Sequence, residues 1–267
     1  MSQQRRPKSR PTEDRKLLRP APYADTSFLD SDAWRALRIM GEFVEGFDSL
    51  ASLGPAISIF GSARLEQDDP YAKAAEELAA KLAHQGITVI TGGGPGVMEA
   101  ANRGAAQAGG VSVGLGIELP HEQDTNRWCN LVLNFRYFFA RKVMFVKYAQ
   151  GFVIFPGGFG TLDELFESLV LVQTGKIDHF PVILYGKSYW SGLLQWLSER
   201  AAREDMIATA DLELLRMTDD TDEALDWIVQ AFAAEDAARE EAEASPHGTQ
   251  PAMAARERNQ QRTTRPE

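Results

Sequence analysis

Residues 152–164 combine the pattern of a buried strand, a glycine-rich turn and the start of a helix. The apolar run 152–155 ends at Pro156-Gly157-Gly158, and a third glycine, a hydroxyl and a carboxylate follow where the helix is expected to open. Such a turn lets backbone N–H groups approach an anion, and the N-terminus of a helix adds a positive field at the same place. The segment therefore predicts a phosphate-binding turn with an acidic side chain beside it.

A second glycine turn follows the apolar strand pattern at residues 87–90. It holds Gly92, Gly93, Gly94 and Gly96 and leads into another helical pattern. In open parallel sheets, ligands bind outside the carboxyl ends of the strands. Two such turns in one domain therefore predict a phosphorylated ligand at the carboxyl ends of adjacent strands.

Short apolar runs alternate with helical patterns through the middle of the chain. The expected strands are residues 56–60, 87–90, 111–117, 131–133, 152–155 and 181–185, and the expected helices are residues 71–85, 96–108, 136–149, 162–174, 188–202 and 221–234. One more helix is expected to begin after Asp30 or Ser31. Strands that are apolar throughout and separated by helices favour a parallel sheet covered on both faces. The pattern predicts a doubly wound, Rossmann-like α/β domain with an extra N-terminal helix.

The two ends of the chain differ in composition from this core. Residues 1–27 are polar and basic, and residues 235–267 contain almost no large apolar side chain. Such segments bury too little apolar surface to offset the entropy lost on ordering. We therefore expect disordered tails at 1–27 and 235–267 around a single domain at 28–234.

Composition narrows the classes of partner and compartment. The formal net charge is −10, whereas nucleic-acid binding requires a clustered basic face, so no nucleic-acid partner is expected. No apolar stretch approaches the ~20 residues that a membrane helix requires, so no membrane partner is expected either. Cys129 is the single cysteine, which excludes an internal disulfide and predicts a reducing, cytoplasmic setting.

Other nucleotide-binding and metal-binding motifs do not occur in the sequence. No Gly-x-x-x-x-Gly-Lys-Ser/Thr is present, and the last glycine of the dinucleotide fingerprint is replaced by Val97 or Glu99. Glu118, at the end of the next strand, is the one residue that suits a dinucleotide ribose. The four histidines are scattered, with no His-Glu-x-x-His. We expect neither a metal nor a cofactor.

The adjacent cations Arg141 and Lys142 lie in the expected helix that precedes residues 152–155. A helix in that position runs back across the sheet, so its N-terminal part can lie near the glycine turns. We expect a positively charged side chain near the glycine turns, because Asp163 and Glu164 would otherwise repel a phosphate at the helix start. The alternative without a function is that Arg141 and Lys142 are solvated charges on the surface of a helix. Glu164 has an alternative of its own, since Thr161-Leu-Asp-Glu164 also fits a capping box.

Four segments together resemble the Lonely guy (LOG) family over roughly residues 55–200. They are residues 156–164, which fit the PGGxGTxxE motif, residues 92–98, similar to the GGGxxGxM turn, Gly61-Ser62, similar to the element after the first strand, and Arg141-Lys142, similar to the RK pair. One departure is Phe138-Phe139, where plant-type members commonly have Met-His.

The resemblance implies a phosphoribohydrolase that releases the base from purine nucleoside 5′-monophosphates, AMP or cytokinin-type N6-modified AMP. It implies no cofactor and a homodimer or larger homo-oligomer. Arg141 and Glu164 would be the catalytic pair. The residues implied to bind phosphate or nucleotide are Gly157, Gly158, Gly160, Thr161, Ser62, Gly92, Gly93, Gly94, Gly96 and Lys142. A carboxylate near the anomeric carbon suits the oxocarbenium-like state of glycosidic cleavage.

Two other functions are considered. A non-catalytic carrier of a nucleotide or of molybdenum cofactor resembles this chain in fold and glycine turns, and it would release its ligand unchanged. The label lysine decarboxylase, given to many relatives, is rejected because no lysine stands in a pyridoxal-binding context.

Overall fold

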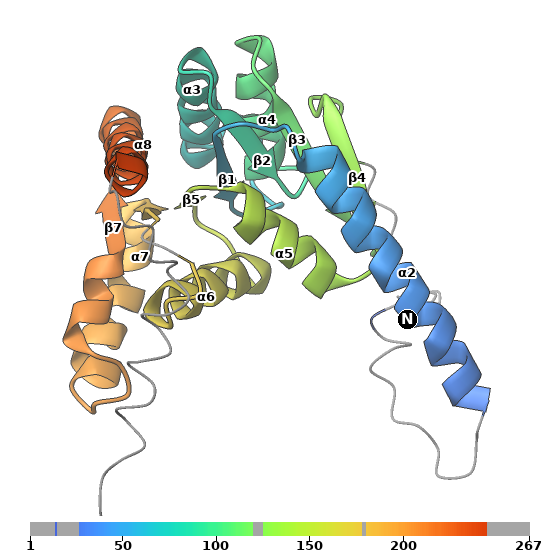
Figure 1. Ribbon diagram of the computed structural model, residues 1–267. Coiled ribbons are helices and arrows are strands. Elements are labelled where there is room, and N and C mark those ends of the chain that lie inside the picture. The colour runs from blue at the N-terminus through green and yellow to red at the C-terminus, as the bar shows by residue number, and fades with distance from the viewer. Residues whose placement is uncertain (1–13, 15–26, 120–124, 178–179, 245–267) are drawn as a thin grey trace, which may run out of the picture. The chain divides into compact units, whose positions relative to one another are not determined.

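The computed structural model describes residues 14, 27–119, 125–177 and 180–244 (Figure 1). Seven parallel strands form one sheet in the order β4-β3-β2-β1-β5-β6-β7. The strands are β1 (Ala56–Phe60), β2 (Thr88–Thr91), β3 (Ser112–Ile117), β4 (Leu131–Phe135), β5 (Phe152–Ile154), β6 (Val182–Tyr185) and β7 (Leu215–Thr218). The order reverses between β1 and β5, which is the switch point of a doubly wound sheet. The predicted fold class is confirmed.

The helices connect and cover these strands. They are α2 (Ser27–Leu50), α3 (Pro70–His84), α4 (Val97–Gln107), α5 (Phe138–Tyr148), α6 (Phe159–Gln173), α7 (Lys187–Trp196) and α8 (Thr221–Ala244). Right-handed crossovers put α3 and α4 on one face of the sheet and α5 and α6 on the other (Figure 1). A π-helical stretch at Leu197–Ala202 and a 3-10 helix at Thr209–Leu214 precede β7. The connection from β3 to β4 contains no helix in its described residues.

The central strands are buried on both faces, as their apolar sequences predict. Every residue of β1, β2, β5 and β6 is buried. The ring of Phe60 makes edge contacts with Phe145 and Phe152, with ring centroids 4.8 and 5.0 Å apart. Each large apolar side chain buried in this way contributes about 1.5–3 kcal/mol to folding. This packing holds the carboxyl ends of β1 and β5 side by side.

Three elements differ from their sequence-based bounds. Helix α6 begins at Phe159, three residues earlier than expected, because the glycines accept the helical conformation. Strand β7 was not predicted, and its short, half-buried sequence carries an arginine at position 216. Helix α8 continues through 235–244, where we expected a disordered tail, because alanine, glutamate and arginine are strong helix formers.

The structure describes residues up to Ala244. The chain divides into two compact units between Ile228 and Val229. The boundaries expected at 28 and 234 therefore stay predictions, and most residues of the two expected tails lie outside the described ranges. None of the helices in those ranges combines the length and apolar character that a membrane span requires.

Candidate active site

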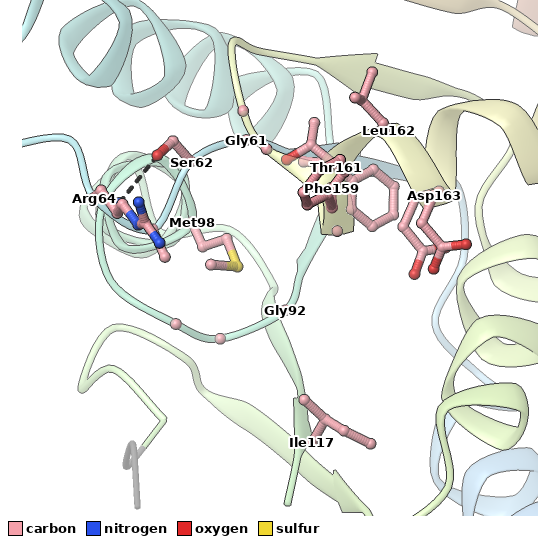
Figure 2. A pocket seen from close by; sticks show the side chains of 18 of the residues that line it. Gly61, Ser62, Arg64, Gly92, Met98, Ile117, Phe159, Thr161, Leu162 and Asp163 are labelled. Atoms are coloured by element: carbon pink, nitrogen blue, oxygen red, sulfur yellow. Dashed lines mark hydrogen bonds between the residues drawn. The ribbon is translucent and has the colours of Figure 1, made fainter. Parts of the chain in front are cut away.

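A cavity of about 820 Å³ lies at the carboxyl ends of β1, β2, β3 and β5. Figure 2 shows residues around it from the turn after β1, the turn after β2 and the start of α6, among them Ser62, Gly92 and Thr161. Most of the predicted site residues line this cavity, namely Ser62, Gly92, Gly93, Gly94, Arg141, Gly157, Gly158, Gly160, Thr161 and Glu164. Gly96 and Lys142 are not among the lining residues. The structure therefore brings both glycine turns and the predicted catalytic pair to one place.

The turns after β1, β2 and β5 hold one another through their backbones. The N–H of Ser62 donates to the carbonyl oxygen of Pro156 at 2.9 Å, and the N–H of Val97 donates to the carbonyl oxygen of Ser62 at 3.1 Å. Gly96 has a φ of +70°, and a Cβ there would lie 2.3 Å from the carbonyl oxygen of Ser62. Gly96 therefore permits the close approach of two turns and does not itself face the cavity.

The turn after β5 leaves the start of α6 open to the cavity. Gly158 is the N-cap of α6, and no side chain caps the helix. The N–H groups of the first helical turn have no partner within the helix, and the helix dipole makes this end positive. A Cβ at Gly158 or Gly160 would meet no atom within 4 Å. The backbone is therefore accessible to an anion.

The capping-box interpretation of Glu164 is wrong. Because α6 begins at Phe159, Thr161 is its third residue and Glu164 its sixth, so Thr161 is not the N-cap. A capping box requires its glutamate at the third helical position, from which the carboxylate reaches back to the N-cap N–H. Glu164 lies in the second turn of α6, buried against the cavity.

Alanine at Gly157 and at Gly158 is expected to have opposite effects. A Cβ at Gly157 would lie 2.1 Å from Oγ1 and 2.7 Å from Cβ of Thr161, whereas Gly158 has open space. Gly157→Ala should therefore destabilise the fold by about 1–3 kcal/mol, as overpacking does. Gly158→Ala should keep wild-type stability and weaken binding of inorganic phosphate. Urea unfolding and phosphate titration test both, and equal unfolding midpoints for the two variants would contradict the predicted packing.

Glu164 is a buried carboxyl group beside the open helix start. Its residue is 6% exposed, and Oε2 has no hydrogen-bond partner among the described residues. Burial raises the pKa of Glu164 to about 7, although the nearby charges of Lys142 and Arg141 act to lower it. An acid with such a pKa changes protonation near neutral pH, as a catalytic acid or base requires.

Arg141 extends from α5 across the carboxyl end of β3. Its Nε donates to the carbonyl oxygen of Leu115 at 2.7 Å, and its guanidinium carbon lies 5.0 Å from the ring centroid of Phe145. A Cβ at Gly92 would lie 2.3 Å from Nη2 of Arg141, so a larger residue there would displace the guanidinium from its place beside the second turn. Burial lowers the pKa of Arg141 to about 10, and the side chain therefore stays protonated at neutral pH.

Lys142 lies among carboxylates and not in the cavity wall. Its Nζ lies 2.8 Å from Oδ2 of Asp163 and 3.8 Å from Oε2 of Glu164, and it also pairs with Glu167. The cation that the sequence required near Asp163 and Glu164 is therefore Lys142. Contact between Lys142 and a nucleotide stays a prediction, since Lys142 is not among the residues that line the cavity.

Sequence reasoning missed the groups that fix the glycine turns from a distance. The side-chain amide of Asn126 donates to the carbonyl oxygens of Gly93 and Gly94, both at 3.1 Å. The hydroxyl of Tyr189, on α7, donates to the carbonyl oxygen of Gly157 at 2.7 Å. An asparagine and a tyrosine outside any motif carry no local signal of such a role.

Part of the remaining wall of the cavity is apolar, although Arg64 and Asp163 also line it. The apolar lining side chains include Met98, Ile117, Leu119 and Phe138. We found no cluster of metal-ligating side chains among the described residues, and His121 and His179 lie outside those ranges. A polar end with backbone N–H groups and an apolar wall suit a ligand that joins a phosphate to a flat, weakly polar group.

Comparison with known proteins agrees with this geometry. A family model described as "Possible lysine decarboxylase" matches residues 98–228. A cytokinin riboside 5′-monophosphate phosphoribohydrolase from Mycobacterium marinum (strain ATCC BAA-535 / M) is 32% identical over 150 residues, covering 55% of this chain and 80% of the relative. A probable enzyme of the same name from Oryza sativa subsp. japonica is 28% identical over 181 residues, covering 66% and 77%.

Solved structures share the fold at lower identity. The molybdenum cofactor carrier protein from Chlamydomonas reinhardtii has a TM-score of 0.50 and 23% identity, covering 67% of this chain and 98% of its own. A molybdenum cofactor binding protein from Rippkaea orientalis has a TM-score of 0.50 and 21% identity, covering 67% and 97%. At these identities the likeness concerns the fold alone.

The family follows from sequence identity together with the matched motifs. The match at 32% identity covers most of the mycobacterial relative. In this chain the family's glycine motif and the arginine of its Arg-Lys pair line one cavity, and the lysine lies next to Glu164. The chain belongs to the Lonely guy (LOG) family.

Proposed function

We propose that this protein hydrolyses the N-glycosidic bond of purine nucleoside 5′-monophosphates. Water adds to the anomeric carbon of the ribose, the bond to the base nitrogen breaks, and the base leaves with a proton. The products are free base and ribose 5-phosphate. The names of the relatives at 32% and 28% identity support this reaction.

The observation that carries the proposal is the position of Glu164 next to an uncapped helix start. The phosphate would accept hydrogen bonds from the backbone N–H groups of the Gly157–Thr161 turn, as anions do at helix N-termini. The ribose would then lie between that turn and Glu164, whose Oε2 has no hydrogen-bond partner among the described residues. The carboxylate would orient the attacking water and stabilise positive charge on the sugar.

Arg141 supplies the second function that the reaction needs. Nε is held by the carbonyl oxygen of Leu115, which leaves the terminal nitrogens of the guanidinium at the cavity. A guanidinium there can donate two parallel hydrogen bonds to ribose or phosphate oxygens. Its charge also favours the ionised form of Glu164.

The direct test is a substrate panel of AMP, GMP, CMP, UMP and N6-isopentenyl-AMP, with bases and ribose 5-phosphate separated by chromatography. We expect release of adenine or of the N6-substituted base in equal amounts with ribose 5-phosphate. Adenosine, which lacks the phosphate, is the control and should react poorly. A folded protein that cleaves none of the five monophosphates would refute the proposal.

The apolar wall supports a purine, including an N6-alkylated one of the cytokinin type. Met98, Ile117 and Leu119 offer a surface that a flat base or a short hydrocarbon chain can cover. The names of the relatives agree with this class of substrate.

The pH dependence of kcat/KM is expected to report Glu164. Because the pKa of Glu164 is raised to about 7, the carboxyl group is mostly protonated at pH 6 and becomes the active carboxylate as pH rises. The rate should rise through pH 7 and level above it. The interval above pH 6.5 is diagnostic, since the second ionisation of a phosphate monoester is centred near ~6 and is mostly complete there. A profile that is flat from pH 6.5 to 8 would contradict ionised Glu164 as the active form.

The carrier function is less well supported than hydrolysis. A carrier requires tight binding but no acid with a pKa near 7, and burying such an acid costs free energy when, among the described residues, one of its oxygens has no hydrogen-bond partner. A lysine decarboxylase is not supported, since none of the described residues lining the cavity is a lysine that could bind pyridoxal.

A homodimer or larger homo-oligomer in the reducing cytoplasm belongs to the same proposal. Large apolar side chains are exposed on α5 and α6, namely Phe139, Val143, Phe166 and Val170. Exposed apolar groups that recur on neighbouring helices mark association surfaces. Light scattering that gives the mass of a single chain at micromolar concentration would contradict this part.

A further inference from the structure

Helix α2 packs closely on α5, the helix that carries Arg141 (Figure 1). The family model matches residues 98–228 and does not include α2. A Cβ at Gly46 would lie 2.7 Å from Sδ of Met144, so the absence of a side chain lets the two helices approach. The hydroxyl of Tyr148 donates to the carbonyl oxygen of Phe47 at 3.1 Å. This extra helix is therefore joined to α5 by specific contacts.

One acidic side chain of α2 is buried against the start of α5. Glu42 is 6% exposed, and its Oε1 accepts the backbone N–H of Arg136 at 2.9 Å. Its Oε2 accepts the backbone N–H of Tyr137 at 3.3 Å. A carboxylate near the N-terminus of a helix is also stabilised by the helix dipole. Glu42 thus binds both residues that connect β4 to α5.

The position of Arg141 depends on that connection. Strand β4 ends at Phe135 and α5 begins at Phe138, so Arg136 and Tyr137 form the connection from which the helix leaves the sheet. The N–H of Phe138 is also held, since it donates to Oδ1 of Asp14 at 3.4 Å. The N-cap Tyr137 makes no side-chain capping bond. Its carbonyl oxygen accepts the N–H of Arg141 at 3.3 Å, one turn into the helix. Two hydrogen bonds therefore lead from Glu42 through the backbone N–H and carbonyl of Tyr137 to Arg141.

We propose that Glu42 is a positioning residue for Arg141, and that α2 serves the active site by fixing the start of α5. The inference rests on the proposed function for its kinetic consequence, but its structural part does not. Glu42 itself does not line the cavity. Its effect passes through the backbone of residues 136 and 137, which orients the guanidinium toward the ribose.

The test compares Glu42→Ala and Glu42→Gln with Glu45→Ala in the full chain. Glu45 is an exposed glutamate on the same helix and is the matched control. Hydrogen–deuterium exchange is measured over residues 136–145 and over α6 as an internal reference. Steady-state kinetics with AMP then give kcat and KM separately.

Glu42→Ala should speed exchange over residues 136–145 without changing α6, and should lower kcat at least about tenfold, because small misplacements of a catalytic group are costly. KM should change less than about threefold, since the phosphate turn is untouched. Glu42→Gln keeps one acceptor oxygen but turns an NH2 donor toward the second N–H, so it should recover only part of both effects. Glu45→Ala should match the wild type.

Unchanged exchange in Glu42→Ala would overturn the structural part, and faster exchange with unchanged kcat would overturn the positioning role. If Glu42→Ala fails to fold, Glu42→Gln decides between the same outcomes. A wild-type protein that hydrolyses no monophosphate would defeat the proposed function. The exchange measurement alone would then decide whether Glu42 holds the start of α5.

Discussion

Glutamine in place of Glu164 is expected to lower kcat for AMP hydrolysis by about 10²–10⁴-fold, the range over which general acid–base groups contribute. The amide has nearly the volume of the acid, so the packing of α6 is kept. It cannot ionise, and therefore neither attracts the proton of the attacking water nor stabilises positive charge on the sugar. Rates of base release at pH 8, with enzyme saturated by AMP, measure the effect.

The stability of the same variant separates lost chemistry from lost structure. The pKa of Glu164 is raised from 4.5 to about 7 by burial, so the folded state holds a proton that the unfolded chain releases above pH 4.5. Wild-type stability should therefore fall from pH 4.5 to 7 and stay lower above that. Up to about 3 kcal/mol of this cost should be absent in the glutamine variant at pH 8. Urea unfolding at pH 4.5 and pH 8 checks the difference.

A Glu164→Gln enzyme with wild-type turnover would remove Glu164 from the reaction. A variant that is less stable than the wild type at pH 8 would contradict the buried state of this carboxyl group, whose Oε2 has no hydrogen-bond partner among the described residues.

Alanine in place of Arg141 is expected to lower kcat/KM by about 10²–10³-fold, as when a donor aimed at developing charge is removed. Lysine should not restore the rate, because a single ammonium cannot hold Leu115 and donate two further parallel bonds. Arg200→Ala is the matched control, since that side chain is exposed and lies 3.9 Å from Glu204. Its kinetics should match the wild type.

Loss of Arg141 should also move the pH profile. The charge of Arg141 lowers the pKa of Glu164, so the midpoint should shift to higher pH in Arg141→Ala. The profile is measured as kcat/KM from pH 6 to 9. A large rate loss with an unshifted midpoint would mean that Arg141 acts without influencing Glu164.

Much of the fold could be predicted from the sequence because its central strands are continuous apolar runs. β1 was predicted with its observed bounds, and the neighbouring strands to within a few residues. Strand β7 was missed because it is a short edge strand, and edge strands need not be apolar throughout. Arg216 lies in it, with its guanidinium 5.5 Å from the ring of Trp227.

The candidate site was predictable where its residues form local sequence motifs. The turn at 156–164 and the pair Arg141-Lys142 could be found because glycines and charges stand at fixed spacing. Contacts over long distances in the sequence left no such signal. The bonds from Asn126 to the second glycine turn and from Glu42 to the start of α5 join residues that only the folded chain brings together.

The start of α6 shows why spacing alone misled. Thr161-Leu-Asp-Glu164 has the residues of a capping box, but the helix begins at Phe159 because Gly158 and Gly160 meet no steric obstacle there. The three earlier residues carry Glu164 into the second turn and toward the cavity. Local pattern gave the residue types, and the helix register decides where they lie.

A crystal structure of the Glu164→Gln protein with AMP tests the central claim most directly. We predict that the phosphate accepts hydrogen bonds from the backbone N–H groups of the Gly157–Thr161 turn. We also predict that Arg141 contacts the ribose or phosphate, and that the side chain of residue 164 faces the anomeric carbon. A phosphate bound elsewhere, or a ribose turned away from residue 164, would contradict the account.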